Sequence, residues 1–167
     1  MSRLSLLNAS ILGLSLLALS AGNAGASEYS LSVDRVKVDT GDFTRMGIGY
    51  NGKTPGPVLR FKEGEDVTIN VTNNLNESTS IHWHGLILPY QQDGVPGISY
   101  DGIDPGETFT YRFPIVQSGT YWFHSHTGFQ EPDGAFGAIV IEPKKREPFR
   151  YDNEYVVQLT DAHPHSG

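Results

Sequence analysis

Four of the six histidines in this 167-residue chain form two His-x-His pairs, His82 with His84 and His124 with His126. In a β-strand, residues two apart lie on the same face, roughly 6–7 Å apart along the chain. The two imidazoles of each pair therefore point the same way, and the residue between them points to the opposite face. If the two pairs lie on neighbouring strands, four imidazoles converge on one small volume.

Four convergent imidazoles have the chemistry of a metal site. Neutral imidazole binds copper, zinc, iron and nickel, and a set without thiolate or nearby carboxylate ligands favours these metals over calcium and magnesium. Histidines on one strand are also spaced widely enough to bind different ions, which permits a cluster of metals. A single His-x-His pair is more often a hydrogen-bonded or surface pair, but two pairs embedded in aromatic strand residues favour metal binding.

Two other interpretations compete with the metal cluster. A mononuclear zinc or iron enzyme on another all-β fold, such as a cupin, adds a glutamate a few residues after the His-x-His, whereas residues 85–88 here are Gly-Leu-Ile-Leu. A domain that only scaffolds a neighbour leaves both histidine pairs unexplained. The metal cluster is therefore favoured over both.

Strand patterns dominate the segments that must position these histidines. Residues 67–71 alternate, residues 108–113 are β-branched and aromatic, and residues 137–141 and 155–159 are short apolar runs. Turn-forming Pro, Gly, Asn and Asp residues separate them, and no segment after the N-terminal one shows a convincing helical period. The sequence predicts an all-β fold, a Greek-key β-sandwich or barrel.

The N-terminus is typical of an export signal. Arg3 gives a short positive start, and residues 11–19 are an almost unbroken apolar run that is too short to span a bilayer. Residues 24–26 (Ala-Gly-Ala) form a small-x-small cleavage site. We expect residues 1–26 to be removed as a signal peptide, which predicts a periplasmic or secreted protein with no membrane attachment after cleavage.

The rest of the chain has the length of one ordinary domain. Residues 27–143 form the predicted domain, and residues 144–167 are the predicted linker and the start of a following segment, because they begin with a charged, proline-containing stretch. The formal net charge of −7 disfavours nucleic acid and anionic membranes as partners.

The chain contains no cysteine, so it has no disulfide framework, no zinc–thiolate site and no thiolate ligand for a blue-copper centre. Its only methionines are Met1, which leaves with the signal peptide, and Met46. Cu(I) prefers soft sulfur ligands, which are nearly absent here. Copper held by this chain is therefore predicted to be Cu(II).

Four segments together resemble the first domain of multicopper oxidases, and within that family the bacterial copper-resistance, laccase-like members. They are residues 80–86 (SIHWHGL), 93–96 (DGVP), 105–113 (PGETFTYRF) and 118–126 (SGTYWFHSH). The likeness extends over most of the chain, from about Tyr50 through Pro143. It implies that residues 27–143 form a plastocyanin-like domain of cupredoxin type.

The resemblance implies a trinuclear copper cluster that reduces dioxygen (O2) to water with electrons from a small reducing substrate, such as a phenol, or from Cu(I). By matching position, His82 would bind the type 2 copper. His84 and His124 would share one ion of the type 3 pair, and His126 would bind the other. This chain would then supply half of the ligands of the cluster.

Asp93, eleven residues after His82, matches an acidic position that in the family lies near the type 2 copper and helps to deliver protons. An aspartate directly before a glycine is also a common turn residue. The sequence leaves both interpretations open.

The family completes the cluster with four further histidines from a C-terminal cupredoxin domain, and receives electrons through a type 1 copper held by a cysteine. This chain carries neither set, so we expect it to be inactive alone and to act with that complementary domain. The alternative is a stand-alone periplasmic protein that binds Cu(II) and confers copper tolerance without turnover.

A third His-x-His pair, His163 with His165, follows the last predicted strand. The proline between the two histidines breaks strand pairing, and residues near a chain end are usually mobile. We therefore predict a loop feature here rather than a ligand set.

Overall fold

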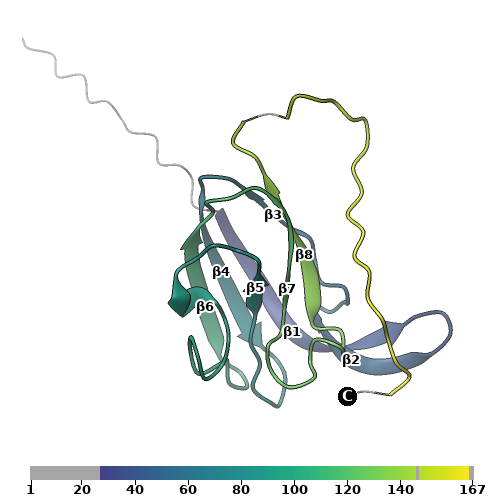
Figure 1. Ribbon diagram of the computed structural model, residues 1–167. Helices are drawn as coiled ribbons and strands as arrows, with labels where there is room; N and C mark the ends of the chain where they lie inside the picture. Colours follow the sequence, from purple (N-terminus) through teal and green to yellow (C-terminus); the bar gives the residue numbers. More distant parts are fainter. Residues whose placement is uncertain (1–26, 146, 166–167) are drawn as a thin grey trace, which may run out of the picture.

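The computed structural model describes residues 27–145 and 147–165, and the predicted signal peptide lies outside them. Two four-stranded sheets pack face to face (Figure 1). One sheet has the order β2-β1-β4-β6, with β1 Ser27–Asp39, β2 Thr44–Tyr50, β4 Asp66–Asn73 and β6 Thr108–Pro114. The other has the order β3-β8-β7-β5, with β3 Leu59–Lys62, β5 His82–His84, β7 Gly119–His124 and β8 Phe136–Glu142.

The predicted all-β sandwich of cupredoxin type is confirmed. Three of the four expected strands lie within β4, β6 and β8. Both sheets are mixed, because β1 runs parallel to β4 and β3 runs parallel to β8, while the other neighbours are antiparallel. Among the described residues the one helical element is the short 3-10 helix η1 Tyr90–Gln92, and no helix there has the length and apolar character to cross a bilayer.

Period-two alternation explains how β4 contributes to the core. Val67, Ile69 and Val71 are buried, whereas the polar residues between them are only partly buried. Successive strand side chains point to opposite faces, so one face of β4 packs in the core and the other lies toward solvent.

Trp83 anchors the three-residue strand β5 in the core. Its side chain is completely buried, and its ring centroid lies 5.1 Å from that of Tyr111, 5.5 Å from Phe113 and 5.9 Å from Phe123. Tyr111 and Phe113 belong to β6, so these contacts join the two sheets. Because alternate strand residues face opposite ways, burial of Trp83 directs both of its neighbours out of the core.

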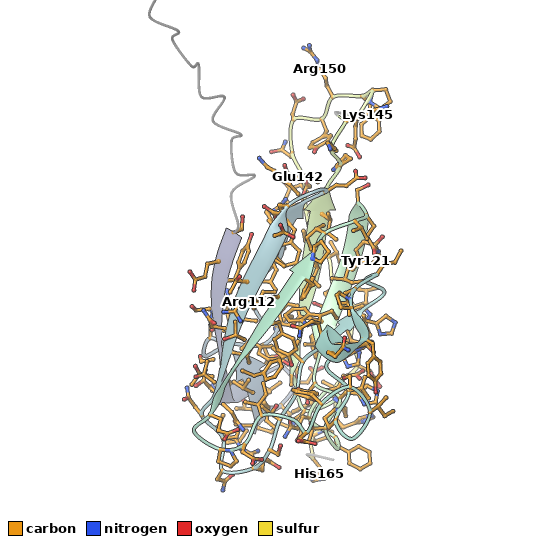
Figure 2. The ribbon with its side chains drawn as sticks, turned by 90° about the vertical axis from the view of Figure 1, so that its left-hand side faces the viewer. Arg112, Tyr121, Glu142, Lys145, Arg150 and His165 are labelled. Carbon is orange, nitrogen blue, oxygen red and sulfur yellow. The ribbon has the colours of Figure 1, made fainter. Side chains whose placement is uncertain are left out.

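The segment after β8 leaves at Glu142, passes Arg150 beyond one end of the sandwich and ends near the other end at His165 (Figure 2). The strand predicted at residues 155–159 is wrong, because within the described chain no residue from 147 to 165 exchanges a backbone–backbone hydrogen bond. The segment runs beside β8, whose two edges are already paired with β3 and β7. A short apolar run forms a strand only where it finds a free partner edge.

Gly94 allows the loop after η1 to lie directly against the start of β5. Its φ is +77°, and a Cβ atom there would lie 1.7 Å from the carbonyl oxygen of Ile81 and 3.1 Å from the backbone nitrogen of His82. Only glycine fits such an approach without strain. This contact brings the loop that carries Asp93 beside the first histidine pair.

Replacing Gly94 by alanine should destabilise the protein more than the same change at Gly97. Gly97 also has a positive φ, +73°, but has open space around it. Gly97→Ala should therefore lower the free energy of unfolding only by the penalty for a left-handed backbone, about 1–2 kcal/mol. Gly94→Ala adds a clash with backbone and should cost about 1–3 kcal/mol more. Urea denaturation of both variants measures this difference, and equal losses of stability would show that the close approach is absent.

Candidate metal centre

Strands β5 and β7 bring the two histidine pairs together. They pair antiparallel, with His82 opposite His124 and His84 opposite Trp122. The opposite face of the same pairing carries Trp83 and Phe123, and both are completely buried. The imidazoles therefore project from the outer side of this sheet, as period-two alternation predicts.

The four imidazoles form one cluster, which we call the histidine cluster (His82, His84, His124 and His126). The ring centroid of His82 lies 5.6 Å from that of His84, 5.4 Å from His124 and 5.8 Å from His126. The centroids of His84 and His124 are 5.5 Å apart, and those of His124 and His126 are 6.2 Å apart. The spacing thus brings all four predicted side chains together, while their function as ligands stays a prediction.

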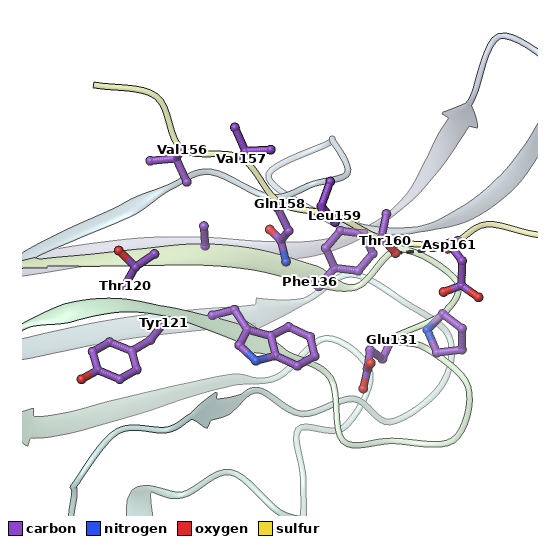
Figure 3. Close-up of a pocket in the computed structure, with 13 residues that line it drawn as sticks. Thr120, Tyr121, Glu131, Phe136, Val156, Val157, Gln158, Leu159, Thr160 and Asp161 are labelled. Atoms are coloured by element: carbon purple, nitrogen blue, oxygen red, sulfur yellow. Dashed lines mark hydrogen bonds between the residues drawn. The ribbon is translucent and has the colours of Figure 1, made fainter. Parts of the chain in front are cut away.

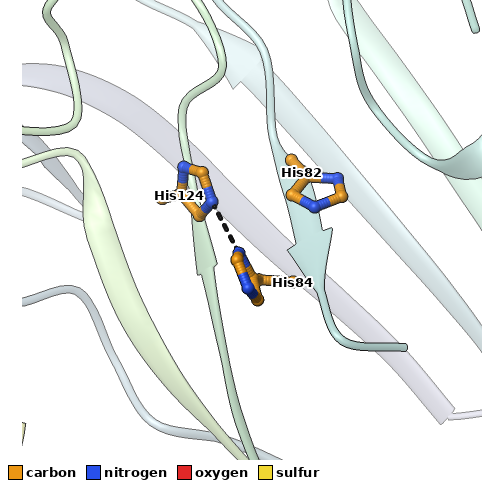
Figure 4. Close-up of side chains that lie close together, drawn as sticks. All are labelled: His82, His84 and His124. Carbon is orange, nitrogen blue, oxygen red and sulfur yellow. Dashed lines mark hydrogen bonds between the residues drawn. The ribbon is translucent and has the colours of Figure 1, made fainter.

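Three members of the cluster present nitrogen atoms at metal-binding separations. One ring nitrogen from each of His82, His84 and His124 lies within 4.8 Å of the others (Figure 4). The shortest separation, 3.3 Å, joins Nδ1 of His84 to Nε2 of His124. Two imidazoles bound to one ion at roughly 2.0–2.1 Å with a tetrahedral angle have nitrogens about 3.3–3.4 Å apart. This nitrogen pair therefore fits two ligands of a single metal ion.

His124 is the most enclosed histidine of the cluster. Burial lowers the pKa of His124 below its usual value, and this outweighs the opposing effects of the Ser125 carbonyl and the Glu131 carboxylate. Its ring stacks on Trp122, with centroids 4.2 Å apart and planes 21° from parallel. A lowered pKa keeps the imidazole neutral, which is the form that binds metals.

His82 is oriented by the loop that Gly94 holds in place. Its Nδ1 lies 2.8 Å from the carbonyl oxygen of Asp93 and 3.5 Å from the Asp93 carboxylate. A proton on Nδ1 is donated to that carbonyl, which leaves Nε2 available for a metal ion. Asp93 also follows η1, where its N–H donates to the carbonyl of Tyr90. Asp93 therefore lies in a turn and also beside the histidine cluster, so the two interpretations that the sequence leaves open are compatible.

His126 lies beyond the end of β7 and is held through its backbone. Its N–H donates to Oγ of Ser80 at 2.9 Å, and the Ser80 hydroxyl is 2.8 Å from the Thr127 hydroxyl. Ser80 lies two residues before His82, the first histidine of the first pair. These contacts join the segments that carry the two histidine pairs.

Gln130 is the buried centre of the polar contacts beneath this junction. Its Oε1 accepts from the hydroxyls of Ser125 at 2.8 Å and Thr79 at 2.7 Å, and its Nε2 donates to the carbonyl of Ser78 at 2.9 Å. Buried polar groups are costly unless they are paired, so this side chain fixes the loop after β7 against the residues before β5.

Sequence reasoning missed Trp122, Gln130 and Glu131. Trp122 had a readable signal, because it lies two residues before His124 and so shares its face of the strand. The other two lie in the loop after β7, where Gln130 contacts Ser78 and Thr79 and Glu131 contacts His124. Neither set of contacts follows from strand periodicity.

The third pair lies outside the histidine cluster, in agreement with the predicted loop feature. The side chain of His163 is 77% exposed and its Nε2 is 3.6 Å from Asp161. Its carbonyl oxygen accepts from Nε of Arg45 at 2.9 Å. The metal-binding group of the described residues includes neither His163 nor His165.

The sandwich and its histidine cluster define an all-β domain with a candidate metal site, and comparison with known proteins identifies its family. Residues 32–146 match the family model described as multicopper oxidase. The chain is 49% identical to copper resistance protein A of Escherichia coli over 149 residues, which cover 87% of this chain and 25% of that protein. It is 53% identical to copper resistance protein A of Pseudomonas syringae pv. tomato over 81% of this chain and 22% of that protein.

Solved structures that resemble this chain are also copper oxidases. A multi-copper oxidase from Pseudomonas thermotolerans superimposes with a TM-score of 0.72 and 34% identity, over 77% of this chain and 32% of that one. The blue copper oxidase from Nitrosomonas europaea has a TM-score of 0.71 and 35% identity, over 74% of this chain and 41% of that one. The chain therefore belongs to the multicopper oxidase family, and it spans about a quarter of the length of the two copper resistance proteins.

Replacing Gln130 by leucine should destabilise the protein by about 2–4 kcal/mol, because two buried hydroxyls and a part-buried carbonyl lose their partner. Gln117 is a matched control, since its side-chain amide also accepts and donates hydrogen bonds, from the N–H of Ile87 and to the carbonyl of Gly85, but at exposed positions. Water replaces those bonds, so Gln117→Leu should cost about 1 kcal/mol or less. Thermal denaturation compares the two variants. A Gln130→Leu protein as stable as the control would show that Gln130 does not fix the loop after β7.

Proposed function

We propose that this chain supplies half of the imidazole ligands of a trinuclear copper cluster in a multicopper oxidase. A complementary C-terminal cupredoxin domain would supply the other half. The observation that carries the proposal is the convergence of four imidazoles from two strand segments, three of them with nitrogens within 4.8 Å of one another. Family membership makes copper the metal, and the absence of thiolate in the chain favours Cu(II).

The ligand assignment gives each histidine one role. We assign His84 and His124 to one ion of the type 3 pair, and the 3.3 Å separation of their facing nitrogens supports this assignment. His126 is assigned to the other type 3 ion. His82 is assigned to the type 2 ion, with Nδ1 directed to the Asp93 carbonyl and Nε2 directed to the metal.

The bound copper ions would supply one-electron steps that allow dioxygen to be reduced to water with electrons from a small reducing substrate or Cu(I). The protein supplies neutral imidazoles and a fixed geometry for them. Asp93 is assigned to proton delivery at this site. Its carboxylate lies 3.5 Å from Nδ1 of His82 and is 38% exposed, so it contacts both the site and solvent.

We also propose that residues 27–143 are the cupredoxin domain and that residues 144–167 lead into the complementary part of the protein. Tyr155, Val157 and Leu159 support this proposal, because they are 82%, 76% and 91% exposed and alternate with the partly buried Val156 and Gln158. An exposed apolar strand pattern without a partner edge is expected where a further sheet pairs with it. The signal peptide would place the protein in the periplasm or outside the cell.

Copper retention tests the ligand assignment directly. The full chain should retain Cu(II) after dialysis, and the double variant His84→Asn, His124→Asn should bind it at least about tenfold more weakly, because two ligands of one ion are lost. The matched control is His163→Asn, His165→Asn, which removes a pair of the same form outside the histidine cluster. Metal analysis after dialysis measures both. Equal losses in the two double variants, or no copper in the wild-type chain, would refute the assignment.

Oxidase activity tests the division of the cluster between two domains. The copper-loaded chain alone should not oxidise phenols or Cu(I), and it should gain this activity when the complementary domain is added. Oxygen consumption measures the reaction, and turnover by the chain alone would overturn the proposal. The names of the two copper resistance proteins favour a second candidate function, Cu(II) binding for copper tolerance without turnover. Retained Cu(II) without any activity after addition of that domain would establish this second function.

A further inference from the structure

Glu131 lies beside the ring nitrogen of His124 that faces away from the histidine cluster. Its Oε2 is 3.0 Å from Nδ1 of His124. The other ring nitrogen, Nε2, faces His84. The carboxylate is therefore placed to accept the proton that must sit on Nδ1 when Nε2 binds a metal ion.

The backbone on both sides of Glu131 is anchored by its neighbours, which sets the point from which its side chain extends. Gln130 is buried among hydroxyl and carbonyl partners on one side. On the other side, Arg45 of β2 pairs with the Asp133 carboxylate at 3.1 Å and donates to the carbonyl of Pro132 at 3.0 Å. The side chains of Arg45 and Asp133 are 8% and 11% exposed.

The Glu131 side chain itself faces a cavity of about 460 Å³ between β7, β8 and the segment after β8 (Figure 3). The side chain of Glu131 is 43% exposed, whereas that of His124 is 7% exposed. Trp122 lines the same cavity and stacks on the His124 ring. Stacking fixes the plane of the imidazole, and the carboxylate fixes which way its nitrogens point within that plane.

We propose that Glu131 is a positioning residue for His124: it accepts the Nδ1 proton and so keeps Nε2 free for copper. Metal-binding histidines commonly donate their second ring N–H to a carboxylate or a backbone carbonyl, which sets the tautomer and makes the ligand nitrogen more basic. The proposal rests on the proposed function, because it needs His124 to be a ligand.

Two other contacts compete for the same proton, and they define what Glu131 adds. The carbonyl oxygen of Ser125 is also 3.0 Å from Nδ1 of His124 and can accept the proton. Nδ1 of His84 can instead accept a proton from Nε2 of His124, and this tautomer blocks the ligand nitrogen. A negative carboxylate is a stronger acceptor than a neutral carbonyl, so Glu131 shifts the balance toward the productive tautomer.

The test compares Glu131→Leu, which removes the acceptor, with Glu131→Gln, which keeps an acceptor and removes the charge. In the metal-free full chain, NMR of the imidazole nitrogens should show the His124 proton on Nδ1 in the wild type and a larger Nε2-protonated fraction in Glu131→Leu. The dissociation constant for Cu(II) should rise about 10–100-fold in Glu131→Leu and less than about tenfold in Glu131→Gln.

The control variant is Asp161→Asn, which removes a carboxylate lining the same cavity without a contact to the histidine cluster. It should leave the tautomer unchanged and the dissociation constant within about twofold of wild type. An unchanged His124 tautomer in Glu131→Leu, or an effect of Asp161→Asn as large as that of Glu131→Leu, would overturn the inference. If the wild-type chain bound no copper, the proposed function would be refuted. The position of the His124 proton in the metal-free chain would still decide the role of Glu131.

Discussion

The antiparallel pairing of β5 with β7 is the constraint on which the metal centre depends. This pairing sets His82 opposite His124 and places His84 within reach of the same ring. Strand β5 has only three residues, so its ladder alone gives little stability, and the buried ring of Trp83 holds it in place. Trp83 thus packs between the two sheets, and its burial directs His82 and His84 to the outer face of the sheet. The packing of the core therefore sets the orientation of these two histidines.

The loop after β7 provides the second support. It carries His126 past the end of the strand, and Gln130 fastens it to the residues before β5. Arg45 connects the same loop to β2 and to the carbonyl of His163 in the segment after β8. Arg45 therefore links the segment after β8 to the loop that positions His126.

Much of this arrangement follows from the sequence, because it rests on local periodicity. The two-residue period of a strand predicts that His82 and His84 share a face and that Trp83 is buried, and the structure confirms both. For the second pair the strand ends at His124, and His126 joins the cluster from the loop after β7. The short apolar run at residues 155–159 also predicted a strand, yet it forms none, since β8 offers no free edge. Gln130 was not predictable, because its role depends on contact between residues about fifty positions apart, such as Thr79 with Gln130. Glu131 was not predictable either, because its contact with His124 depends on how the loop after β7 folds back toward the end of that strand.

The central claim is that the imidazoles of this cluster are shared ligands of copper, and its sharpest point is the ion between His84 and His124. A crystal of the full chain loaded with Cu(II), measured with X-rays on both sides of the copper absorption edge, locates the metal without assumptions about ligands. The account predicts an anomalous peak within bonding distance of both Nδ1 of His84 and Nε2 of His124. A peak at His163 and His165 alone, or no ordered copper in the histidine cluster, would contradict it.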